Sequence, residues 1–356
     1  MSEKAILIVW DRMGDYHLAR IKACRELIGP KVYSADLGSA DTLYQWNNVS
    51  DSKHFVLSDK PVHQKDFIQR FLHFRKILSE KHITHIAMGY GRTEYIFFLV
   101  FARLTGIKTI VFCESWYERN SIKDFLKSCM LKVIGTFFFV SGERAFNHFV
   151  YRYRIRPAKV FKGYSVVDNK HFQAIEEKDK RYLLCVARYS EEKNLNFLIQ
   201  CFAQSIIITK YELLIIGDGP LKEKLKKQIE DLKTDHIILS DWKNYKELPG
   251  IYAGAIACIL PSTFEPWGLV INEAMAASLP VLISDDCGCK PDLLDEGENG
   301  WSFNSMDEKD LIRVLDIVAT NNIHSITNMG SKSESIIRGY SPESWARNIN
   351  HFVSLN

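Results

Sequence analysis

The 356-residue sequence lacks the segments that mark a secreted or membrane-spanning protein. The start, MSEKAILIVWDR, passes from charged residues into a strand-like run and has no signal-peptide cleavage pattern. No apolar stretch approaches the roughly 20 residues that a membrane-spanning helix needs. The eight cysteines stand mostly alone in apolar or helical contexts, as reduced thiols do. We therefore expect a cytoplasmic protein.

Strong charge and metal-ligand spacing are also lacking. The formal net charge is only +3, so nothing in the overall balance calls for a nucleic-acid partner. The close pair Cys287-Gly-Cys289 has no second Cys or His pair at metal-ligand spacing, which favours a turn over a zinc site. With 46% hydrophobic and 25% charged residues, the composition is that of a globular protein, and the length suits two domains.

Apolar runs alternate with helix-period segments along most of the chain, which predicts parallel sheets with crossover helices. The segment 154–181 breaks this alternation and ends in a charged run, so we place the linker there. We expect one domain over 1–165 and a second over 166–340. The predicted strands are Ala5–Trp10, Lys31–Tyr33, His85–Met88, Thr109–Cys113, Thr136–Val140, Tyr182–Val186, Glu212–Ile216, His236–Leu239, Ala257–Leu260 and Pro280–Ile283.

The stretch FEPWGLVINEAM places two carboxylates, Glu265 and Glu273, in apolar surroundings. The helix between the last two predicted strands is expected to start near Gly268 and to end near Ala277. Its first amides and the positive end of its dipole favour an anion such as a phosphate. Glu273, in the second turn, could accept hydrogen bonds from the vicinal hydroxyls of a ribose, while Glu265 meets the other end of the same ligand.

Cations and glycines follow earlier strands of the same predicted sheet. Arg188 and Lys193 come after one strand and could clamp a diphosphate. Gly217, Asp218 and Gly219 come after the next strand, where glycines let the backbone approach a bound group. Taken singly, each feature has an ordinary explanation, such as a solvated turn or an exposed loop acid. Their shared placement after successive strands favours a binding site.

These residues resemble a known family, the retaining nucleotide-sugar glycosyltransferases of family 4, which have the GT-B fold. The resemblance rests on Arg188 with Lys193, on GDGP, and on STFEPWGLVINEAMAASLPVLIS, and it is strong over about 162–303. It implies an α/β protein of two Rossmann-like doubly wound parallel-sheet domains facing across a cleft. It also implies a UDP- or GDP-sugar donor, a glycan or lipid-linked acceptor, and a role in cell-surface polysaccharide biosynthesis.

The resemblance also implies a role for each matching residue. Arg188 and Lys193 would neutralise the donor diphosphate and stabilise the departing nucleotide. The remaining donor contacts would come from Phe264 and Glu265 to the sugar, Gly268, Leu269 and Val270 to the phosphates, Glu273 to the ribose, Gly217, Asp218 and Gly219 at the sheet edge, and Trp242 or Lys243 beside the base. Enzymes of this family retain the anomeric configuration of the donor sugar. The chain contains no D-x-D triplet, the usual metal anchor of the other large glycosyltransferase fold, so we expect neither a metal nor another cofactor.

Acceptor recognition in this family falls to the N-terminal domain. Candidate acceptor residues are Asp11, Gly14, His17 and Arg20 after the first strand, Gly91 in GYGRTEY, and Glu114, which stands where relatives often carry a histidine. His17 and Arg20, three apart, are expected to face the same side of a helix. A surface helix with a histidine and a helix-capping Glu114 are the alternatives.

The stretch 120–135 mixes lysines with apolar residues, as a helix resting on an anionic membrane would, although most such helices are packing elements. By resemblance, the terminal helix over 341–356 packs back on the N-terminal domain. Three alternatives to a transferase remain open: a sugar-nucleotide epimerase, a phosphorylase on the same scaffold, and a non-catalytic subunit that binds the nucleotide sugar.

Overall fold

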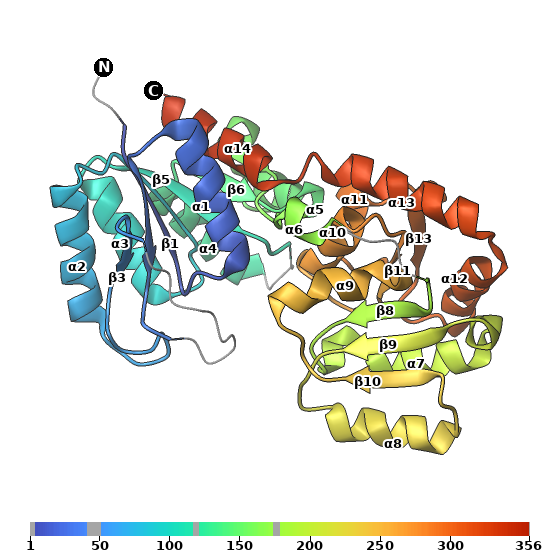
Figure 1. Ribbon diagram of the computed structural model, residues 1–356. Coiled ribbons are helices and arrows are strands. Elements are labelled where there is room, and N and C mark those ends of the chain that lie inside the picture. The colour runs from blue at the N-terminus through green and yellow to red at the C-terminus, as the bar shows by residue number, and fades with distance from the viewer. Residues whose placement is uncertain (1–3, 41–50, 117–120, 174–178, 356) are drawn as a thin grey trace. The chain divides into compact units, whose positions relative to one another are not determined.

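The computed structural model describes residues 4–40, 51–116, 121–173 and 179–355 (Figure 1). The chain divides into two compact units. The N-terminal unit comprises Met1–Val166 together with Pro342–Asn356, and the C-terminal unit comprises Val167–Ser341. Each unit has a hydrophobic core of its own, built on a parallel sheet.

The N-terminal unit is built on a seven-stranded parallel sheet in the order β3-β2-β1-β4-β5-β6-β7. Its strands are β1 (Ile6–Trp10), β2 (Val32–Asp36), β3 (His54–Val56), β4 (His85–Met88), β5 (Lys108–Cys113), β6 (Phe137–Val140) and β7 (Val160–Lys162). Its helices are α1 (Asp15–Ile28), α2 (Phe67–Glu80), α3 (Thr93–Leu104), α4 (Ser121–Ile134), α5 (Glu143–Asn147) with the π turn η1 (His148–Arg152), the short η2 (Pro157–Lys159), and α14 (Pro342–Ser354). Continuous apolar strands such as ILIVW are buried throughout because helices cover both faces of the sheet.

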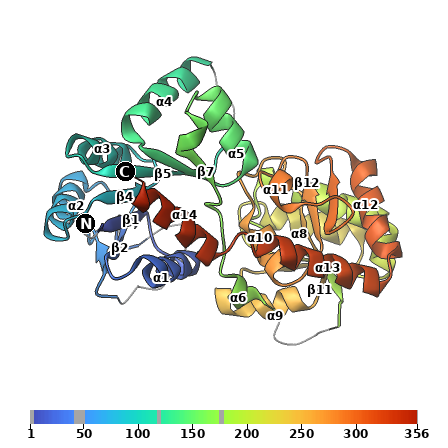
Figure 2. The same ribbon diagram turned by 90° about the horizontal axis from the view of Figure 1, so that it is seen from above.

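The C-terminal helix α14 packs beside α1 on the sheet of the N-terminal unit (Figure 2). Trp345 is fully buried and lies 5.7 Å from the ring of Phe139, and Phe352 meets Phe161 edge-on at 4.6 Å between ring centroids. Lysine side chains reach the end of the helix: Lys4 donates to the Val353 carbonyl oxygen at 2.6 Å, where positive charge favours a helix C-terminus.

The C-terminal unit is built on a six-stranded parallel sheet in the order β10-β9-β8-β11-β12-β13. Its strands are β8 (Tyr182–Val186), β9 (Glu212–Ile216), β10 (Ile237–Ser240), β11 (Ala255–Leu260), β12 (Val281–Ser284) and β13 (Gly300–Phe303). Its helices are α6 (Asn169–Phe172), η3 (Glu191–Lys193), α7 (Leu195–Gln204), η4 (Ile206–Thr209), α8 (Lys222–Leu232), η5 (Tyr245–Glu247), α9 (Leu248–Ala253), α10 (Leu269–Ala276), α11 (Lys290–Leu293), α12 (Glu308–Thr320) and α13 (Ile323–Ile337).

The prediction of two doubly wound parallel sheets is confirmed, and each of the ten predicted strands lies within three residues of an observed one. The prediction missed β3, β7 and β13, which are strands of three or four residues. So short a strand shows no period in a sequence. The expected linker 154–181 is not free of structure, because it contains β7, which completes the first sheet, and α6.

Candidate functional site

The strand order of the C-terminal unit marks one point on its sheet for ligand binding. The chain winds outward from β8 to β9 and β10, then returns to the other side of β8 with β11. In doubly wound sheets a ligand binds at the carboxyl ends of the strands where the order reverses. The reversal lies between β8, which is followed by Arg188 and Lys193, and β11, which is followed by Glu265 and Gly268.

Two glycines in the loop after β9 allow it to pack closely against the loop after β8, which carries Arg188. A β-carbon on Gly217 would lie 1.9 Å from the Ala187 carbonyl oxygen, and one on Gly219 would lie 2.6 Å from the Tyr189 carbonyl oxygen. The two glycines therefore let the loop after β9 pack directly on the loop after β8. Tyr189 is fully buried, and its hydroxyl donates to the Ser240 carbonyl oxygen at 2.9 Å.

Arg188 is exposed between two buried neighbours, Ala187 and Tyr189. Within the described part of the chain, its guanidinium makes no hydrogen bond and no ion pair. Its charge acts on Glu192 of the same turn, whose pKa is lowered by a hydrogen bond from Ser190 and further by the charges of Lys193 and Arg188. An exposed guanidinium on a locked backbone, with no hydrogen bond of its own, is suited to an anionic ligand.

Lys193 forms an ion pair with Glu265, at 19% and 12% side-chain exposure. The two loops are also joined through their backbones, since the Thr263 amide donates to the Glu192 carbonyl oxygen at 2.9 Å. Lys193 therefore does not pair with the adjacent acids of its own turn, as a merely solvated turn would. The ion pair brings together the residues that the sequence placed 72 positions apart.

The helix α10 begins at the expected place, with Gly268 as the N-cap and Ala277 as the C-cap. Gly268 has φ of +103°, a conformation that side chains rarely adopt, and a β-carbon there would lie 2.7 Å from a methyl of Leu260. Leu269 and Val270, half-buried, form the first turn. The amides of a first helical turn have no partner within their own helix and carry the positive end of the helix dipole.

Glu273 is buried in the second turn of α10 with only 3% exposure. The hydroxyl of Tyr252, on α9, donates to its Oε2 at 2.7 Å. Tyr252 is held in turn by the edge of Phe172 at 5.8 Å between ring centroids. A buried carboxylate requires such donors because its desolvation is costly. No pattern in the sequence indicated Tyr252, which reaches Glu273 where α6 packs on both α9 and α10.

The other predicted donor residues lie on the same edge of the sheet. Asp218 is exposed and lies 3.6 Å from the ammonium of Lys222. Phe264 is half-buried beside Glu265. Trp242, 58% exposed, and Lys243 follow β10, which is separated from the reversal point by β9 and β8.

The N-terminal unit has a reversal point of its own between β1 and β4. Asp11, after β1, accepts from Arg92 at 2.8 Å and from the hydroxyl of Tyr95 at 2.5 Å. Burial, followed by the charge of Asp11, raises the pKa of Tyr95 well above its usual value. Gly91 is exposed at this point, and a β-carbon on it would meet nothing within 4 Å. The motif GYGRTEY thus supplies Arg92 and Tyr95 as the groups in contact with Asp11, and the sequence had singled out only its glycine.

His17 and Arg20 do lie side by side, but they face inward. The amide of Gly14 donates to Nδ1 of His17 at 3.0 Å, and the imidazole lies 4.5 Å from the ring of Trp10. Burial and the charge of Arg20 lower the pKa of His17 well below its usual value, so this side chain is neutral. With Nδ1 accepting, its proton resides on Nε2.

Arg20 is 2% exposed and donates to the Val166 carbonyl oxygen at 2.6 Å. Its guanidinium lies 5.3 Å from the ring centroid of Tyr164, and Glu114 contributes opposite charge nearby. Glu114 itself accepts from the hydroxyl of Ser165 at 2.9 Å. The carboxylate is therefore bonded to a residue after β7 in the same unit.

The cysteine pair contributes to packing. Cys287 and Cys289 are fully buried, and burial raises the pKa of the Cys289 thiol well above its usual value. Among the residues that the structure describes, no three His, Cys, Asp or Glu side chains gather as a set of metal ligands. Nor does the described chain contain a helix with the length and hydropathy required to cross a membrane.

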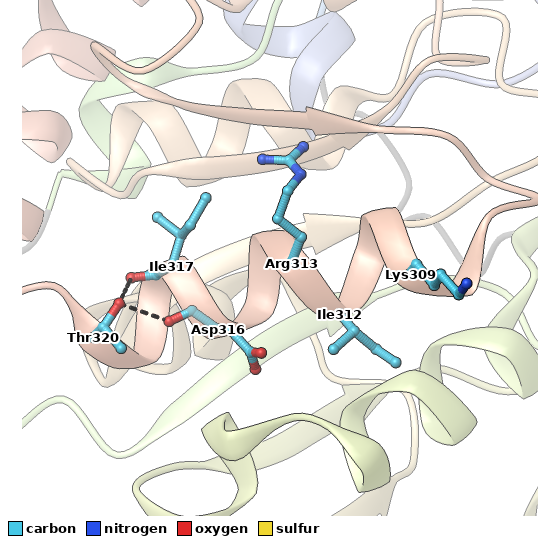
Figure 3. A pocket seen from close by; sticks show the side chains of 6 residues that line it. All are labelled: Lys309, Ile312, Arg313, Asp316, Ile317 and Thr320. Carbon is cyan, nitrogen blue, oxygen red and sulfur yellow. Dashed lines mark hydrogen bonds between the residues drawn. The ribbon is translucent and has the colours of Figure 1, made fainter.

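A separate hollow lies along α12 (Figure 3), lined by Lys309, Ile312, Arg313, Asp316, Ile317 and Thr320. Three of its four polar side chains already have partners: Arg313 donates to Asp310 at 2.7 Å, Asp316 accepts from Ser205 at 2.5 Å, and Thr320 donates to backbone oxygens of its own helix. None of the residues at the β8–β11 reversal lines it. We therefore place the candidate site at the reversal point.

A family model described as "Glycosyl transferases group 1" matches residues 166–352. Among curated proteins, the chain is 26% identical over 286 residues to N-acetylgalactosamine-N,N'-diacetylbacillosaminyl-diphospho-undecaprenol 4-alpha-N-acetylgalactosaminyltransferase of Campylobacter jejuni, covering 74% of this chain and 75% of that one. It is 30% identical over 187 residues to the alpha-monoglucosyldiacylglycerol synthase of Acholeplasma laidlawii, covering 50% and 46%. The chain spans 26% to 46% of the length of the first four curated relatives that it matches.

Solved structures share the fold over nearly the whole length. The Anabaena protein HepE, in complex with UDP and glucose, superimposes with a TM-score of 0.75 at 14% sequence identity. The match covers 99% of each chain.

Proposed function

Because the chain belongs to the group 1 glycosyl transferases, we propose that it moves a sugar from a UDP- or GDP-sugar to a glycan or lipid-linked acceptor, in the biosynthesis of a cell-surface polysaccharide. The observation that carries the proposal is the placement of Arg188, the Lys193–Glu265 pair and the start of α10 in the segments that follow the neighbouring strands β8 and β11, at the reversal of strand order. The names of the relatives support the substrate classes: HepE is bound to UDP and glucose, one curated relative is named for an undecaprenol-linked acceptor, and another for a diacylglycerol product.

The donor is assigned from the charge pattern of the site. The diphosphate lies on the amides of Leu269 and Val270 beside Arg188, where a helix start and an exposed guanidinium both favour negative charge. Glu273, fixed by Tyr252, accepts from the ribose hydroxyls. Gly217, Asp218, Gly219, Trp242 and Lys243 line the path from the ribose towards the base, and Phe264 and Glu265 meet the sugar.

The reaction breaks the bond between the anomeric carbon and the diphosphate oxygen and forms a bond from that carbon to an acceptor hydroxyl oxygen. The electron pair of the broken bond leaves with the nucleoside diphosphate, and Arg188 and Lys193 stabilise the charge that develops there. The acceptor proton passes to an oxygen of the departing phosphate on the same face of the sugar, so configuration is retained. Glu265 supports the positive character of the sugar, and because its charge is already matched by Lys193, it is poorly suited to act as a covalent nucleophile.

We also propose that the transfer needs no metal ion. In the proposed binding mode, Arg188 and Lys193 neutralise the diphosphate, which a divalent ion would otherwise do; the exposure of Arg188 and the position of Lys193 beside Glu265 support this. Activity should therefore survive an excess of chelator, and its loss on chelation followed by recovery with a divalent ion would contradict the proposal.

Acceptor recognition falls to the N-terminal unit. The exposed Gly91 leaves room beside the Asp11–Arg92–Tyr95 cluster. Gly14, His17 and Glu114 are assigned as neighbouring acceptor residues, and Arg20, at 2% exposure, acts on His17 and Glu114 through its charge and not by contact with the acceptor. The neutral His17 offers its Nε2 proton to an acceptor oxygen and supplies no charge.

The test is a two-stage assay on the purified protein. Thermal-shift screening against UDP, GDP, ADP and their sugar conjugates identifies the donor, because a ligand that binds the native state raises its apparent stability. Radiolabelled donor is then supplied with extracted lipid-linked saccharides, and the products are analysed by mass and by anomeric configuration. The proposal predicts a glycosylated acceptor with the donor's configuration.

Other products identify the rivals. A changed sugar nucleotide without an acceptor product indicates an epimerase, and a sugar phosphate formed with inorganic phosphate indicates a phosphorylase. Tight nucleotide binding without turnover, unaltered in Glu265→Ala, indicates a non-catalytic subunit. Each of these results would contradict the proposed transfer.

A further inference from the structure

Helix α4 carries apolar side chains on both of its sides. Its inner side is buried, with Leu131 and Ile134 at 0% exposure in the core of the N-terminal unit. Its outer side carries Ile122, Phe125, Leu126 and Val133 at 57% to 69% exposure, together with exposed Cys129. At about 100° per residue these five outer residues fall within an arc of roughly 100°, which we call the α4 face.

Lysines flank this arc on both sides. On the same helical geometry, exposed Lys132 lies about 20° beyond one border of the α4 face, and exposed Lys123 lies about 60° beyond the other. An apolar stripe bordered by long cationic side chains is the arrangement of a helix lying in a membrane interface. The stripe is placed among the acyl chains, and the ammonium groups reach the lipid phosphates.

A basic segment runs beside α4. Arg152 donates to Asp124 at 2.8 Å, and Ser128 donates to the Tyr153 carbonyl oxygen at 2.5 Å, which ties this segment to the helix. The cationic side chains of the basic segment, all exposed, are Arg152, Arg154, Arg156 and Lys159. Buried Tyr153 and Ile155 alternate with the arginines and anchor the backbone.

The segment that contains α4 and the basic segment has a higher net positive charge than the whole chain. Between residues 121 and 162 the sequence has nine lysines and arginines against two acids, a net charge of +7, whereas the whole chain carries +3. Charge of one sign gathered around an exposed apolar stripe favours a partner that is both negatively charged and apolar. An anionic lipid bilayer has both properties.

The neighbouring helix continues the apolar surface. Helix α3 packs beside α4 and exposes Phe97 at 56% and Leu104 at 82%. Figure 2 shows α3 and α4 on the side of the sheet away from α1 and α14. The face of the N-terminal unit opposite α14 thus presents several large apolar side chains to solvent.

We propose that the α4 face and the basic segment dock the N-terminal unit on an anionic lipid bilayer, with α4 lying in the plane of the interface. The exposed apolar residues enter the boundary between head groups and acyl chains, and the cations pair with anionic head groups. Docking of this kind places the protein at a lipid surface whether or not the proposed sugar transfer takes place there.

Vesicle sedimentation of the full chain tests the docking. Large vesicles of phosphatidylcholine alone are compared with vesicles containing about 30% phosphatidylglycerol. We expect at least about tenfold stronger partitioning to the anionic vesicles, with most of the difference lost in about 0.5 M NaCl. The variant Phe125→Ser/Leu126→Ser should reduce binding to anionic vesicles by at least about tenfold, and Arg154→Glu/Arg156→Glu should abolish the preference for them.

Control variants distinguish docking through the α4 face from non-specific hydrophobic adsorption and from misfolding. The variant Ile206→Ser/Ile323→Ser removes two exposed apolar side chains from the C-terminal unit, at 49% and 47% exposure, and should bind vesicles as the parent does. All variants should keep the parent thermal unfolding profile. Equal binding of Phe125→Ser/Leu126→Ser and the parent, or no binding of the parent to either vesicle, would overturn the inference. The inference would also be overturned if the Phe125→Ser/Leu126→Ser variant differed from the parent only in self-association, measured by sedimentation velocity. That result would assign the α4 face to contact between copies of the chain.

Discussion

Replacing Gly217 by alanine tests how the loop that carries Arg188 is held. Gly217 does not have the positive φ that disfavours side chains, so the substitution adds a methyl group and little else. That methyl carbon would lie 1.9 Å from the Ala187 carbonyl oxygen and 3.0 Å from the ring of Tyr189. Restoring even a 3.0 Å contact requires the two loops to separate by about 1 Å.

The magnitude follows from overpacking. Such insertions cost about 1–3 kcal/mol, which lowers the Tm of a unit of this size by about 2–12 °C. Because Arg188 is attached to the displaced loop, the stabilisation by UDP or GDP should also fall, and a misplacement of about 1 Å can cost about 100-fold in rate.

The matched control is Gly91→Ala, where the added β-carbon meets nothing within 4 Å and the backbone has no positive φ. We expect its Tm and its nucleotide-induced shift to equal those of the parent, both measured by differential scanning fluorimetry. If Gly217→Ala kept the parent Tm and the full nucleotide shift, the packing argument would be refuted. If it kept the Tm but lost the shift, the glycine would contact the ligand itself and not the neighbouring loop.

Three further outcomes are expected. Tyr252→Phe keeps the ring packing but removes a donor from buried Glu273, so it should cost about 1–3 kcal/mol of stability and weaken UDP binding more than pyrophosphate binding, as calorimetry would show. Burial lowers the pKa of His85 to about 4 in the folded protein, so the unfolded chain binds a proton at His85 more readily than the folded chain does. Up to about 3 kcal/mol of folding stability, present above about pH 6.5, should therefore be lost as the pH falls towards 4. His85→Asn should flatten that slope in urea unfolding followed across pH, and an unchanged slope would exclude His85 as its source. Lys193→Ala should slow transfer more than it weakens UDP binding, because Lys193 is already paired with Glu265 before the diphosphate leaves; an equal loss in both would count against its role in stabilising the leaving group.

The sequence predicts most of the fold because buried parallel strands carry a strong apolar signal. Runs such as ILIVW and ELLII need no tertiary information to be identified as strands. The three-residue strand β7, with one buried residue in a basic stretch, has no such signal, and its place in the sheet is set by its neighbour β6.

For the site, local patterns located Gly268 and the bounds of α10, since a glycine before an apolar helix and a proline after it are both visible in the sequence. Contacts that depend on tertiary packing could not be found in this way. Tyr252 reaches Glu273 from another helix, and the role of Gly217 depends on a carbonyl 30 residues earlier in the chain. The inward orientation of Arg20 is likewise set by Val166, far away in sequence.

The central claim is that a nucleoside diphosphate binds at the β8–β11 reversal through Arg188. Calorimetric titration of UDP and GDP into the parent, Arg188→Ala and Arg313→Ala tests it most directly, since Arg313 is an exposed arginine of the same unit that lines the hollow on α12. We predict that Arg188→Ala weakens the tighter nucleotide by about 10- to 100-fold, as expected for the loss of a charge-assisted contact, and that Arg313→Ala leaves its dissociation constant unchanged. Unchanged affinity in Arg188→Ala, or a loss confined to Arg313→Ala, would contradict the account.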